Sequence, residues 1–363
     1  MNTMKYIGAA CVLGVLLATG ACRKAEPPVS DKELAVSIMT FNVENLFDNV
    51  DDPGKDDRTY LALSDKQTEE HRAACATIEV RHWREQCEDW DWNDDVIDKK
   101  LRAVAKTILQ VGNGKGADIV ALQEIENLGI LERLRTDYLG DAAYLPAVLI
   151  EGNDLRGIDV AFLTKLPLVG APRLHSIPFE GVDSARVDDT RGILQAEFQL
   201  PDGNILSGFA VHFPAPFHPT EMREIAYGRL NELLDDLPAD RPAFAAGDFN
   251  TTSSEDARED LLGRLVRSRW TVAHETGCGD CRGTQYYAPD DSWSFLDMIL
   301  WASGDSRGEN TTWGIRADSV EVANKLPAQV TADGTPNRFS LAEGGGVSDH
   351  WPLVMTIESK QKQ

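Results

Sequence analysis

The sequence lacks the motifs that define several large enzyme classes. Its 363 residues contain no Gly-x-x-x-x-Gly-Lys-Ser/Thr loop, no Gly-x-Ser-x-Gly turn between a predicted strand and a predicted helix, and no His-Glu-x-x-His pair; the one Gly-x-Ser-x-Gly match, at 304–308, lies in a stretch of predicted loops. The first motif cradles nucleotide phosphates, the second exposes a nucleophilic serine, and the third holds a catalytic zinc ion. Their absence excludes P-loop nucleotide hydrolases, serine hydrolases of the elbow type and zinc proteases with that motif.

Positive charge is also scarce. The chain has 36 lysines and arginines against 59 aspartates and glutamates, which gives a net charge of −23 at pH 7. Such a chain repels polyanions at long range, so the charge disfavours tight, sequence-independent binding to nucleic acid. The same field favours a divalent cation at a carboxylate-rich site. Solubility alone is the competing interpretation of this charge.

Long apolar runs are confined to the N-terminus. Lys5 precedes an apolar run over 6–18, and small residues follow it up to Cys22. This order is typical of a signal peptide over residues 1–22, and the run is too short for an ordinary membrane span. Residues 18–22 resemble a bacterial lipobox, although Thr19 stands where leucine is usual. We expect export to the periplasm or outer membrane, with a lipid anchor on Cys22 and a tether over 23–33. Ordinary cleavage is the alternative.

Export changes the chemistry expected of the remaining cysteines. Beyond Cys22 the predicted mature chain has four, namely Cys75, Cys87, Cys278 and Cys281. An even number in an oxidising compartment favours disulfides, and we expect the local pairs 75–87 and 278–281. A four-cysteine zinc site is one alternative, but the first pair is widely spaced for a zinc knuckle. A redox role for the second pair is another, without the surrounding pattern of a thioredoxin.

Apolar strands alternate with hairpins and amphipathic helices along most of the chain. We expect strands at 35–43, 118–122, 158–163, 192–200, 205–212, 242–246, 294–301 and 351–357. Helical spacing occurs at 96–110 and 221–234, and glycine-rich loops are expected over 304–346. Residues 51–95, which are acidic and contain two cysteines and three tryptophans, are typical of an insertion. The pattern predicts an α/β fold of mixed sheets with helices outside, in one catalytic domain over 34–358 followed by a tail over 359–363.

Polar residues recur at the ends of these predicted strands. The clusters are Asn42 with Glu44, Glu124, His212, Asp248 with Asn250, Asp297, and Asp349 with His350. One such cluster is usually a turn or a helix cap, and a lone buried histidine is usually a hydrogen-bonded core residue. Six clusters at strand ends together favour a functional site, because sheets and their loops are where sites assemble.

Oxygen-rich clusters of this kind suit phosphoryl transfer to water. Carboxylate and amide oxygens are ligands for Mg²⁺, Mn²⁺ or Ca²⁺ rather than for zinc. A metal ion neutralises the phosphate in the transition state. A histidine beside a carboxylate can accept a proton from water, and a second histidine can donate to a phosphoryl oxygen.

Eight segments of the chain resemble the endonuclease/exonuclease/phosphatase superfamily, the deoxyribonuclease-I-like hydrolases. They are residues 39–47, 121–124, 156–161, 190–192, 211–213, 246–250, 294–299 and 348–353. They follow the order of that superfamily and include its Gly-Asp-x-Asn element at 247–250 and its Ser-Asp-His element at 348–350. The resemblance implies a four-layered α/β sandwich, with two mixed β-sheets packed face to face and helices outside.

The resemblance also implies a role for each polar residue. Glu124 matches the principal metal ligand and Asn42 the amide beside it, while Glu44 and Asp349 match acidic positions near the metal. Mg²⁺, or Mn²⁺ or Ca²⁺ in its place, is the expected cofactor. These four residues form the predicted metal side of the site.

The remaining positions match the groups that act on water and phosphate. His350 matches the general base and Asp297 its carboxylate partner. Three further matches complete the set: Asp248 and Asn250 orient water and a phosphate oxygen, His212 hydrogen-bonds the scissile phosphate, and Arg191 contacts phosphate.

These matches predict an exported, monomeric, metal-dependent phosphoesterase in which His350 activates the attacking water. The substrate stays open between nucleic acid and a small or lipid phosphoester, and no basic or aromatic-interleaved stripe favours nucleic acid. An inactive surface lipoprotein that binds a partner through the same fold is the alternative, with the tryptophan-rich insertion as the binding surface. The complete set of polar strand ends favours the enzyme.

Overall fold

Two mixed β-sheets form the centre of the protein. The computed structural model describes residue 1 and residues 34–303, 313–341 and 345–359, and within them each large sheet has six strands. The first sheet has the order β13-β14-β1-β2-β4-β3, with bounds Trp313–Val322, Leu353–Ser359, Ala35–Leu46, Ile119–Ile125, Asp159–Thr164 and Val148–Leu149. The second has the order β5-β6-β7-β8-β12-β9, with bounds Arg173–His175, Ile193–Gln199, Ile205–His212, Ala243–Asp248, Asp297–Ala302 and Thr271–Val272. In each sheet one central pair, β1 with β2 or β7 with β8, runs parallel and its other pairs run antiparallel.

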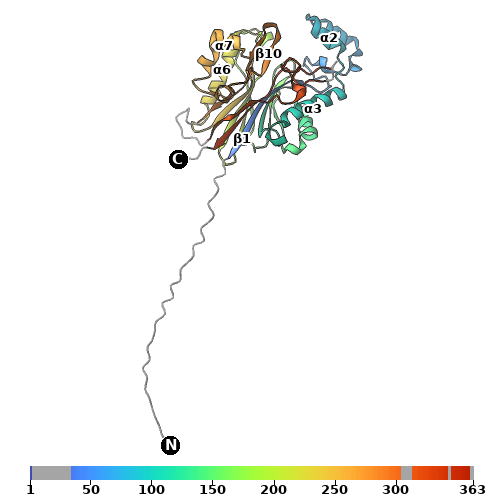
Figure 1. Ribbon diagram of the computed structural model, residues 1–363. Helices are drawn as coiled ribbons and strands as arrows, with labels where there is room; N and C mark the ends of the chain where they lie inside the picture. The colour runs from blue at the N-terminus through green and yellow to red at the C-terminus, as the bar shows by residue number, and fades with distance from the viewer. Residues whose placement is uncertain (2–33, 304–312, 342–344, 360–363) are drawn as a thin grey trace. The chain divides into compact units, whose positions relative to one another are not determined.

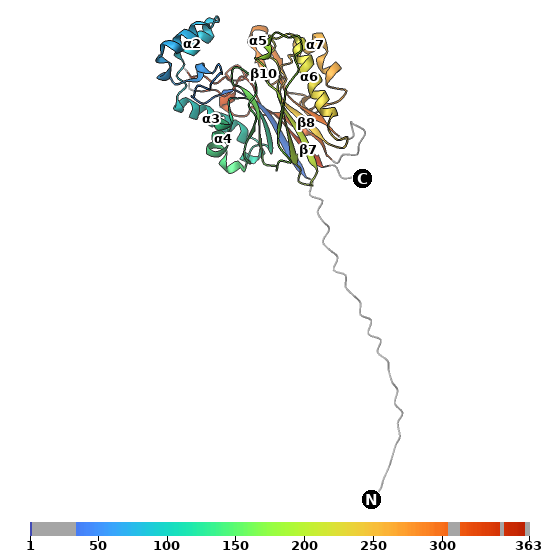
Figure 2. The same ribbon diagram turned by 180° about the vertical axis from the view of Figure 1, so that it is seen from behind.

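Helices cover the outer faces of the two sheets. The α-helices are α1 Glu69–Ala76, α2 Arg81–Asp89, α3 Asp94–Leu109, α4 Leu128–Arg133, α5 Ser184–Val187, α6 Thr220–Asp235, α7 Ser253–Glu259, α8 Leu261–Leu265 and α9 Ala273–Gly277. Figure 1 shows α3 on one side of the sheets, with α6 and α7 on the other. The view from behind in Figure 2 places α4 beside α3.

Three separate layers of apolar side chains hold this arrangement together. The middle layer lies between the sheets and includes Ile38, Phe162 and Phe244. One outer layer joins the first sheet to α3 and α4, and the other joins the second sheet to α6 and α8. The central strands are therefore apolar on both faces, as in β2, where six of seven residues are buried. Three cores between four layers confirm the predicted α/β sandwich.

Helix α3 shows how the sequence dictates one of these layers. The side chain of Asn93 caps its first turn by accepting a hydrogen bond from the backbone N–H of Val96. Leu101, Val104 and Ile108 recur at helical spacing and are fully buried against the first sheet. Each such side chain contributes about 1.5–3 kcal/mol by leaving water. The helix ends at Leu109, within one residue of the end of the helical spacing predicted over 96–110.

Residues 51–95 fold into a small helical unit. Helices α1 and α2 are joined by the disulfide between Cys75 and Cys87, and Figures 1 and 2 show α2 beyond the ends of the sheets on the α3 side. Of its three tryptophans, Trp92 is buried, whereas Trp83 is exposed. The other expected disulfide, Cys278–Cys281, is also present. Both predicted pairings are confirmed.

Two strand predictions need correction. Glycine-rich loops were expected over 304–346, but β13 occupies Trp313–Val322 in that stretch. Among the described residues it is an edge strand paired with β14 alone, so its partly exposed residues are mostly polar and give a weak apolar signal. The expected strand 294–301 is split between β11, Ser292–Ser294, and β12; β11 pairs instead with β10, Gln285–Tyr287.

The predicted signal peptide and tether lie outside the described residues, except for Met1. Most of the predicted tail over 359–363 also lies outside them. Within the described ranges, no helix combines the length and the apolar character needed to cross a bilayer.

Candidate active site

The polar strand ends of both sheets meet at one end of the sandwich. Asn42 and Glu124 lie at the ends of the parallel neighbours β1 and β2 in the first sheet. In the second sheet, His212, Asp248 and Asp297 stand in register on β7, β8 and β12. Parallel neighbours present their carboxyl ends at the same edge, so each sheet places its polar residues together.

The backbone bends sharply where these residues occur. Of the eight non-glycine residues with positive φ angles in the described part of the chain, four lie here: Glu44 (56°), Asn45 (59°), Glu124 (65°) and Asn250 (51°). The register of β1 against β2 shifts just after Asn42, and the register of β2 against β4 shifts across Glu124. Such bulges turn a side chain away from the regular alternation of the strand. Left-handed non-glycine residues cost about 1–3 kcal/mol each, and this strain is characteristic of functional sites.

Asn42 connects the two sheets. Its buried Nδ2 donates to Oε1 of Glu124 at 3.2 Å and to Oδ2 of Asp248 at 3.1 Å. Its Oδ1 accepts the backbone N–H of Glu44 at 3.0 Å, and the backbone N–H of Asn45 donates to the second oxygen of Glu124 at 2.9 Å. The amide thereby fixes both carboxylates across the gap between the sheets.

His350 forms a buried pair with Asp297. Its Nδ1 lies 2.7 Å from Oδ2 of Asp297, so the ring donates from Nδ1 and directs Nε2 toward the site. Burial lowers the pKa of His350, but the charge and hydrogen bond of Asp297 outweigh burial and leave this pKa well above its usual range. Ser348 supports the loop, because its hydroxyl accepts the backbone N–H of His350 and donates to the carbonyl of Asn42.

Asp248 faces both histidines. Its Oδ2 lies 3.9 Å from Nε2 of His350 and 3.6 Å from Nε2 of His212. Burial raises the pKa of Asp248 to about 7, although the neighbouring His350 opposes this change. The backbone N–H of Asn250 donates to Oδ1 of Asp248, and the side-chain amide of Asn250 donates to the carbonyl of Phe213. The turn after β8 is therefore held rigidly.

His212 differs from His350 in its charge state. Burial, followed by the positive charges of Arg191 and Arg156, holds the pKa of His212 well below its usual value. The ring is therefore neutral at neutral pH, and its Nδ1 is buried without a hydrogen-bond partner among the described residues. A neutral imidazole still offers one N–H donor, so His212 can hydrogen-bond a phosphoryl oxygen without carrying charge.

Arg191 is buried and largely occupied by protein groups. Its Nη1 bonds the carboxylate of Asp154 at 2.9 Å and the carbonyl of Asp189 at 3.1 Å. Its Nε is buried without a hydrogen-bond partner in the described part of the chain. Contact with phosphate therefore stays a prediction for Arg191, and the structure adds a structural role that fixes the loop around Asp154.

Arg338 joins the two acidic residues predicted on the metal side. Its guanidinium bonds Glu44 at 2.5 Å and Asp349 at 3.2 Å. Burial raises the pKa of Glu44 and the charge of Asp349 raises it further, while Lys100 and Arg338 oppose this effect. Two carboxylates therefore repel each other beside Glu124, and this local excess of negative charge suits a divalent cation.

A cavity of about 1020 Å³ opens at this point, and Glu44, Glu124 and Asp349 line it. These three acids do not form a tight ligand group among the described residues. Instead, Asp248, Asp297 and His350 place ligand atoms within 4.8 Å of one another. The hard oxygen donors and the excess of carboxylates fit a Mg²⁺-type ion near Glu124.

Two supporting residues were missed by sequence reasoning. Arg338 lies in the glycine-rich stretch that gave no motif, and Ser348 was seen only as part of the Ser-Asp-His element. No periodicity or spacing in the sequence predicts that Arg338 contacts Glu44 or that Ser348 contacts Asn42. Arg338 itself is exposed, and its guanidinium offsets the charge of Glu44 and Asp349 from the solvent side.

The fold and these strand ends define a class of protein, the four-layered α/β sandwiches that gather carboxylates, amides and a His–Asp pair between the ends of two sheets. The chain belongs to the Endonuclease/Exonuclease/phosphatase family, whose model matches residues 39–350. That match contains every candidate residue from Asn42 to His350. No curated protein matches the sequence significantly.

Solved structures agree with this assignment at the level of the fold. A TDP2 from D. rerio, humanized by 14 mutations, superposes with a TM-score of 0.55 and 15% identity, over 89% of this chain and 98% of the other. An endonuclease/exonuclease/phosphatase family protein from Bacteroides thetaiotaomicron gives 0.54 and 14%, over 91% and 100%. A third, from Bacteroides vulgatus, gives 0.53 and 18%, over 90% and 99%.

Proposed function

We propose that this protein is an exported, divalent-metal-dependent phosphohydrolase that cleaves a phosphodiester with water. The observation that carries the proposal is the buried His350–Asp297 pair, whose free Nε2 faces Asp248 while Asn42 links Asp248 to Glu124. A base with its orienting carboxylate thus stands across a narrow gap from a carboxylate that suits a metal ion. Membership of the family supports the reaction class.

Each residue has a distinct task in this proposal. Deprotonated His350 accepts a proton at Nε2 from a water molecule, and Asp297 stabilises the imidazolium that forms. Asp248 and Asn250 orient the water, while His212 donates its N–H to a phosphoryl oxygen. Glu124, with Asn42, Glu44 and Asp349 around it, would hold the metal, which when bound neutralises charge on the phosphate.

The catalytic unit comprises residues 34–358, with the helical insertion at about 51–95. Export is supported by the N-terminal sequence pattern and by the disulfides Cys75–Cys87 and Cys278–Cys281, since such bonds persist in oxidising compartments. We place the protein in the periplasm or at the outer membrane, with Cys22 as the anchor. Palmitate labelling of wild-type cells against a Cys22→Ser strain tests the anchor, and label retained in the variant rejects it.

Metal restoration tests the enzymatic proposal. The mature protein is stripped with a chelator, and hydrolysis of bis-(p-nitrophenyl) phosphate is followed as Mg²⁺, Mn²⁺ or Ca²⁺ is added back. We expect turnover to return with at least one of these ions and to be lost in His350→Ala. Turnover that is indifferent to chelation rejects the metal, and a full rate in His350→Ala rejects the base.

A further inference from the structure

The cavity beside Glu124 extends well beyond the groups that carry the proposed chemistry. Residues of the insertion line part of it, among them Tyr60, Trp83 and Trp90, and Phe217 lines it as well. At about 1020 Å³ it is far larger than one phosphate group requires. The cavity is therefore shaped for a substituent attached to the phosphate.

Three of the eleven large apolar side chains that are exposed among the described residues line this cavity. Trp83 is 59% exposed, Phe217 is 73% exposed and Leu155 is 50% exposed, and all three line it. Single exposed apolar residues need no explanation, but several around one concavity next to a candidate site are characteristic of ligand binding.

Ring packing and a disulfide hold Tyr60 and the backbone that carries Trp83 in place. Tyr60 stacks on Phe47 with ring centroids 3.9 Å apart, and Trp92 packs against the edge of Tyr60 at 5.2 Å. The disulfide Cys75–Cys87 ties α1 to α2, the helix that carries Trp83.

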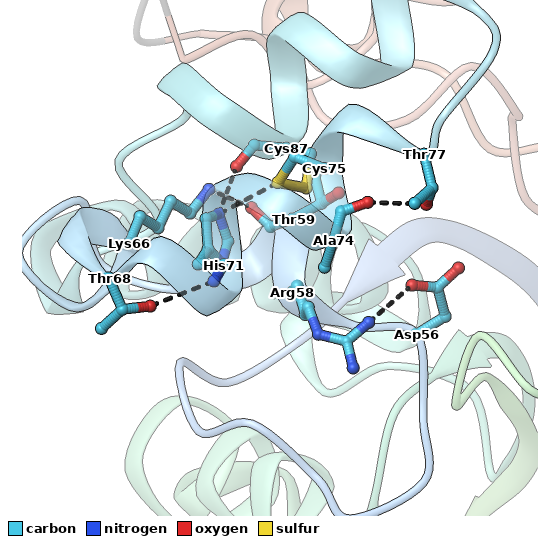
Figure 3. The surroundings of a disulfide bond; sticks show 10 residues. All are labelled: Asp56, Arg58, Thr59, Lys66, Thr68, His71, Ala74, Cys75, Thr77 and Cys87. Atoms are coloured by element: carbon cyan, nitrogen blue, oxygen red, sulfur yellow. Dashed lines mark hydrogen bonds and ion pairs between the residues drawn. A yellow bond between two sulfur atoms is a disulfide. The ribbon is translucent and has the colours of Figure 1, made fainter.

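Figure 3 shows two further ties around this disulfide. The ring of His71 bonds the carbonyl of Cys87 at 2.9 Å, and Nζ of Lys66 donates to the carbonyl of Thr59 at 2.8 Å. A wall held in this way loses little conformational entropy when it binds a ligand.

The charges around the cavity select against a polyanion. The arginines that line it, Arg156 and Arg338, are already paired, Arg156 with Asp189 at 3.2 Å and Arg338 with Glu44 and Asp349. Further carboxylates on the wall belong to Asp56, Asp188 and Asp189. A second phosphate here would meet acids rather than cations, so a continuous nucleic-acid strand is disfavoured.

We propose that this cavity binds one uncharged aromatic ring of the nucleobase type, linked to the phosphate that is cleaved beside Glu124. The inference rests on the proposed function and names its substrate class as a small phosphoester. Aromatic side chains offer π-faces for stacking, which suits a flat ring better than an alkyl chain. The carboxylates on the same wall can accept hydrogen bonds from the ring N–H and amino groups of a base.

A matched pair of ligands isolates the contribution of the ring. Adenosine 5′-monophosphate and ribose 5-phosphate share the phosphate and the sugar, and only the first carries a base. Isothermal titration of the metal-loaded mature protein should give a dissociation constant that is at least about fivefold lower for the nucleotide, as expected for stacking on aromatic side chains. Equal dissociation constants would overturn the proposal.

Variants then assign the effect to the wall. Trp83→Ala and Phe217→Ala remove exposed side chains, so both should fold, and each should bring the ratio of the two dissociation constants toward one. Leu145→Ala is the matched control, because Leu145 is 38% exposed and does not line this cavity. A ratio that is unchanged in both aromatic variants places the base elsewhere and rejects the assignment.

An alkyl ligand separates this proposal from a lipid-binding cavity. Octyl phosphate should bind more weakly than the nucleotide, and tighter binding that depends on Trp83 overturns the aromatic assignment. Hydrolysis of bis-(p-nitrophenyl) phosphate is measured in parallel. Active protein without a nucleotide preference disproves the ring site alone, whereas inactive protein that keeps the preference disproves the hydrolase alone.

Discussion

Replacing Asp297 by asparagine changes the charge beside His350 with almost no change in shape. The carboxylate lies 2.7 Å from Nδ1 of His350, and both side chains are buried. A hydrogen bond to a charged group contributes about 1.5–3 kcal/mol, which corresponds to a rate loss of roughly 10- to 150-fold. The amide also permits the other ring tautomer, which directs Nε2–H rather than a lone pair at the water and deepens the loss.

The assay is steady-state hydrolysis of bis-(p-nitrophenyl) phosphate by wild type and Asp297→Asn at saturating metal. We expect kcat to fall while KM changes much less, because Asp297 acts through the base and not on the substrate. Asp118→Asn is the matched control, since Asp118 precedes the opposite end of β2 and bonds Ser37 there. An unchanged kcat in folded Asp297→Asn protein would refute the assigned pair.

Three further predictions address other parts of the molecule. The double change Cys75→Ser and Cys87→Ser opens a loop of 12 residues and should destabilise the insertion by about 3 kcal/mol. Proteolysis between α1 and α2 should therefore be faster, and an unchanged cleavage rate would argue against a stabilising role for the disulfide. Burial lowers the pKa of His274 to about 4, so the unfolded chain binds this proton first as pH falls. The contribution of neutral His274 to the free energy of unfolding should be complete above about pH 6.5 and about 2 kcal/mol smaller near pH 5. Denaturant melts measure this free energy, and the loss at low pH should be absent in His274→Gln. Arg338 competes with a metal ion for the carboxylates of Glu44 and Asp349, so Arg338→Ala should tighten Mn²⁺ binding roughly tenfold by calorimetry. Weaker Mn²⁺ binding in this variant would contradict that competition.

The fold and the strand-end residues were predictable because each depends on local sequence. Central strands buried on both faces are continuous apolar runs, and the turn Gly247-Asp248-Phe249-Asn250 follows one of them directly. The β1–β2 and β7–β8 pairs then bring separate clusters to the same edges. Local patterns therefore suffice to identify the candidate residues.

Contacts between distant segments could not be predicted in this way. Arg338 reaches Glu44 across 294 residues of sequence, and no spacing encodes that contact. The edge strand β13 is polar on its exposed positions and resembles a loop. The left-handed conformations of Glu124 and Asn250 are also invisible in sequence, because these residue types adopt other conformations readily.

The tryptophan-rich insertion illustrates the same limit. Its composition is consistent with either a small local core or a binding surface, and the structure divides the residues between both. Trp92 is buried against Phe47, whereas Trp83 stands exposed on the cavity wall. Only tertiary packing decides which tryptophan faces solvent.

The most direct test of the central claim is phosphodiester hydrolysis by wild type, Glu124→Gln and His350→Ala in one assay, each as a function of added Mg²⁺ or Mn²⁺. We predict metal-dependent turnover in wild type, a much higher metal requirement in Glu124→Gln, and turnover lost at every metal concentration in His350→Ala. Folded wild-type protein that hydrolyses no phosphodiester with any of these ions, or variants that match its rate and metal dependence, would contradict the account.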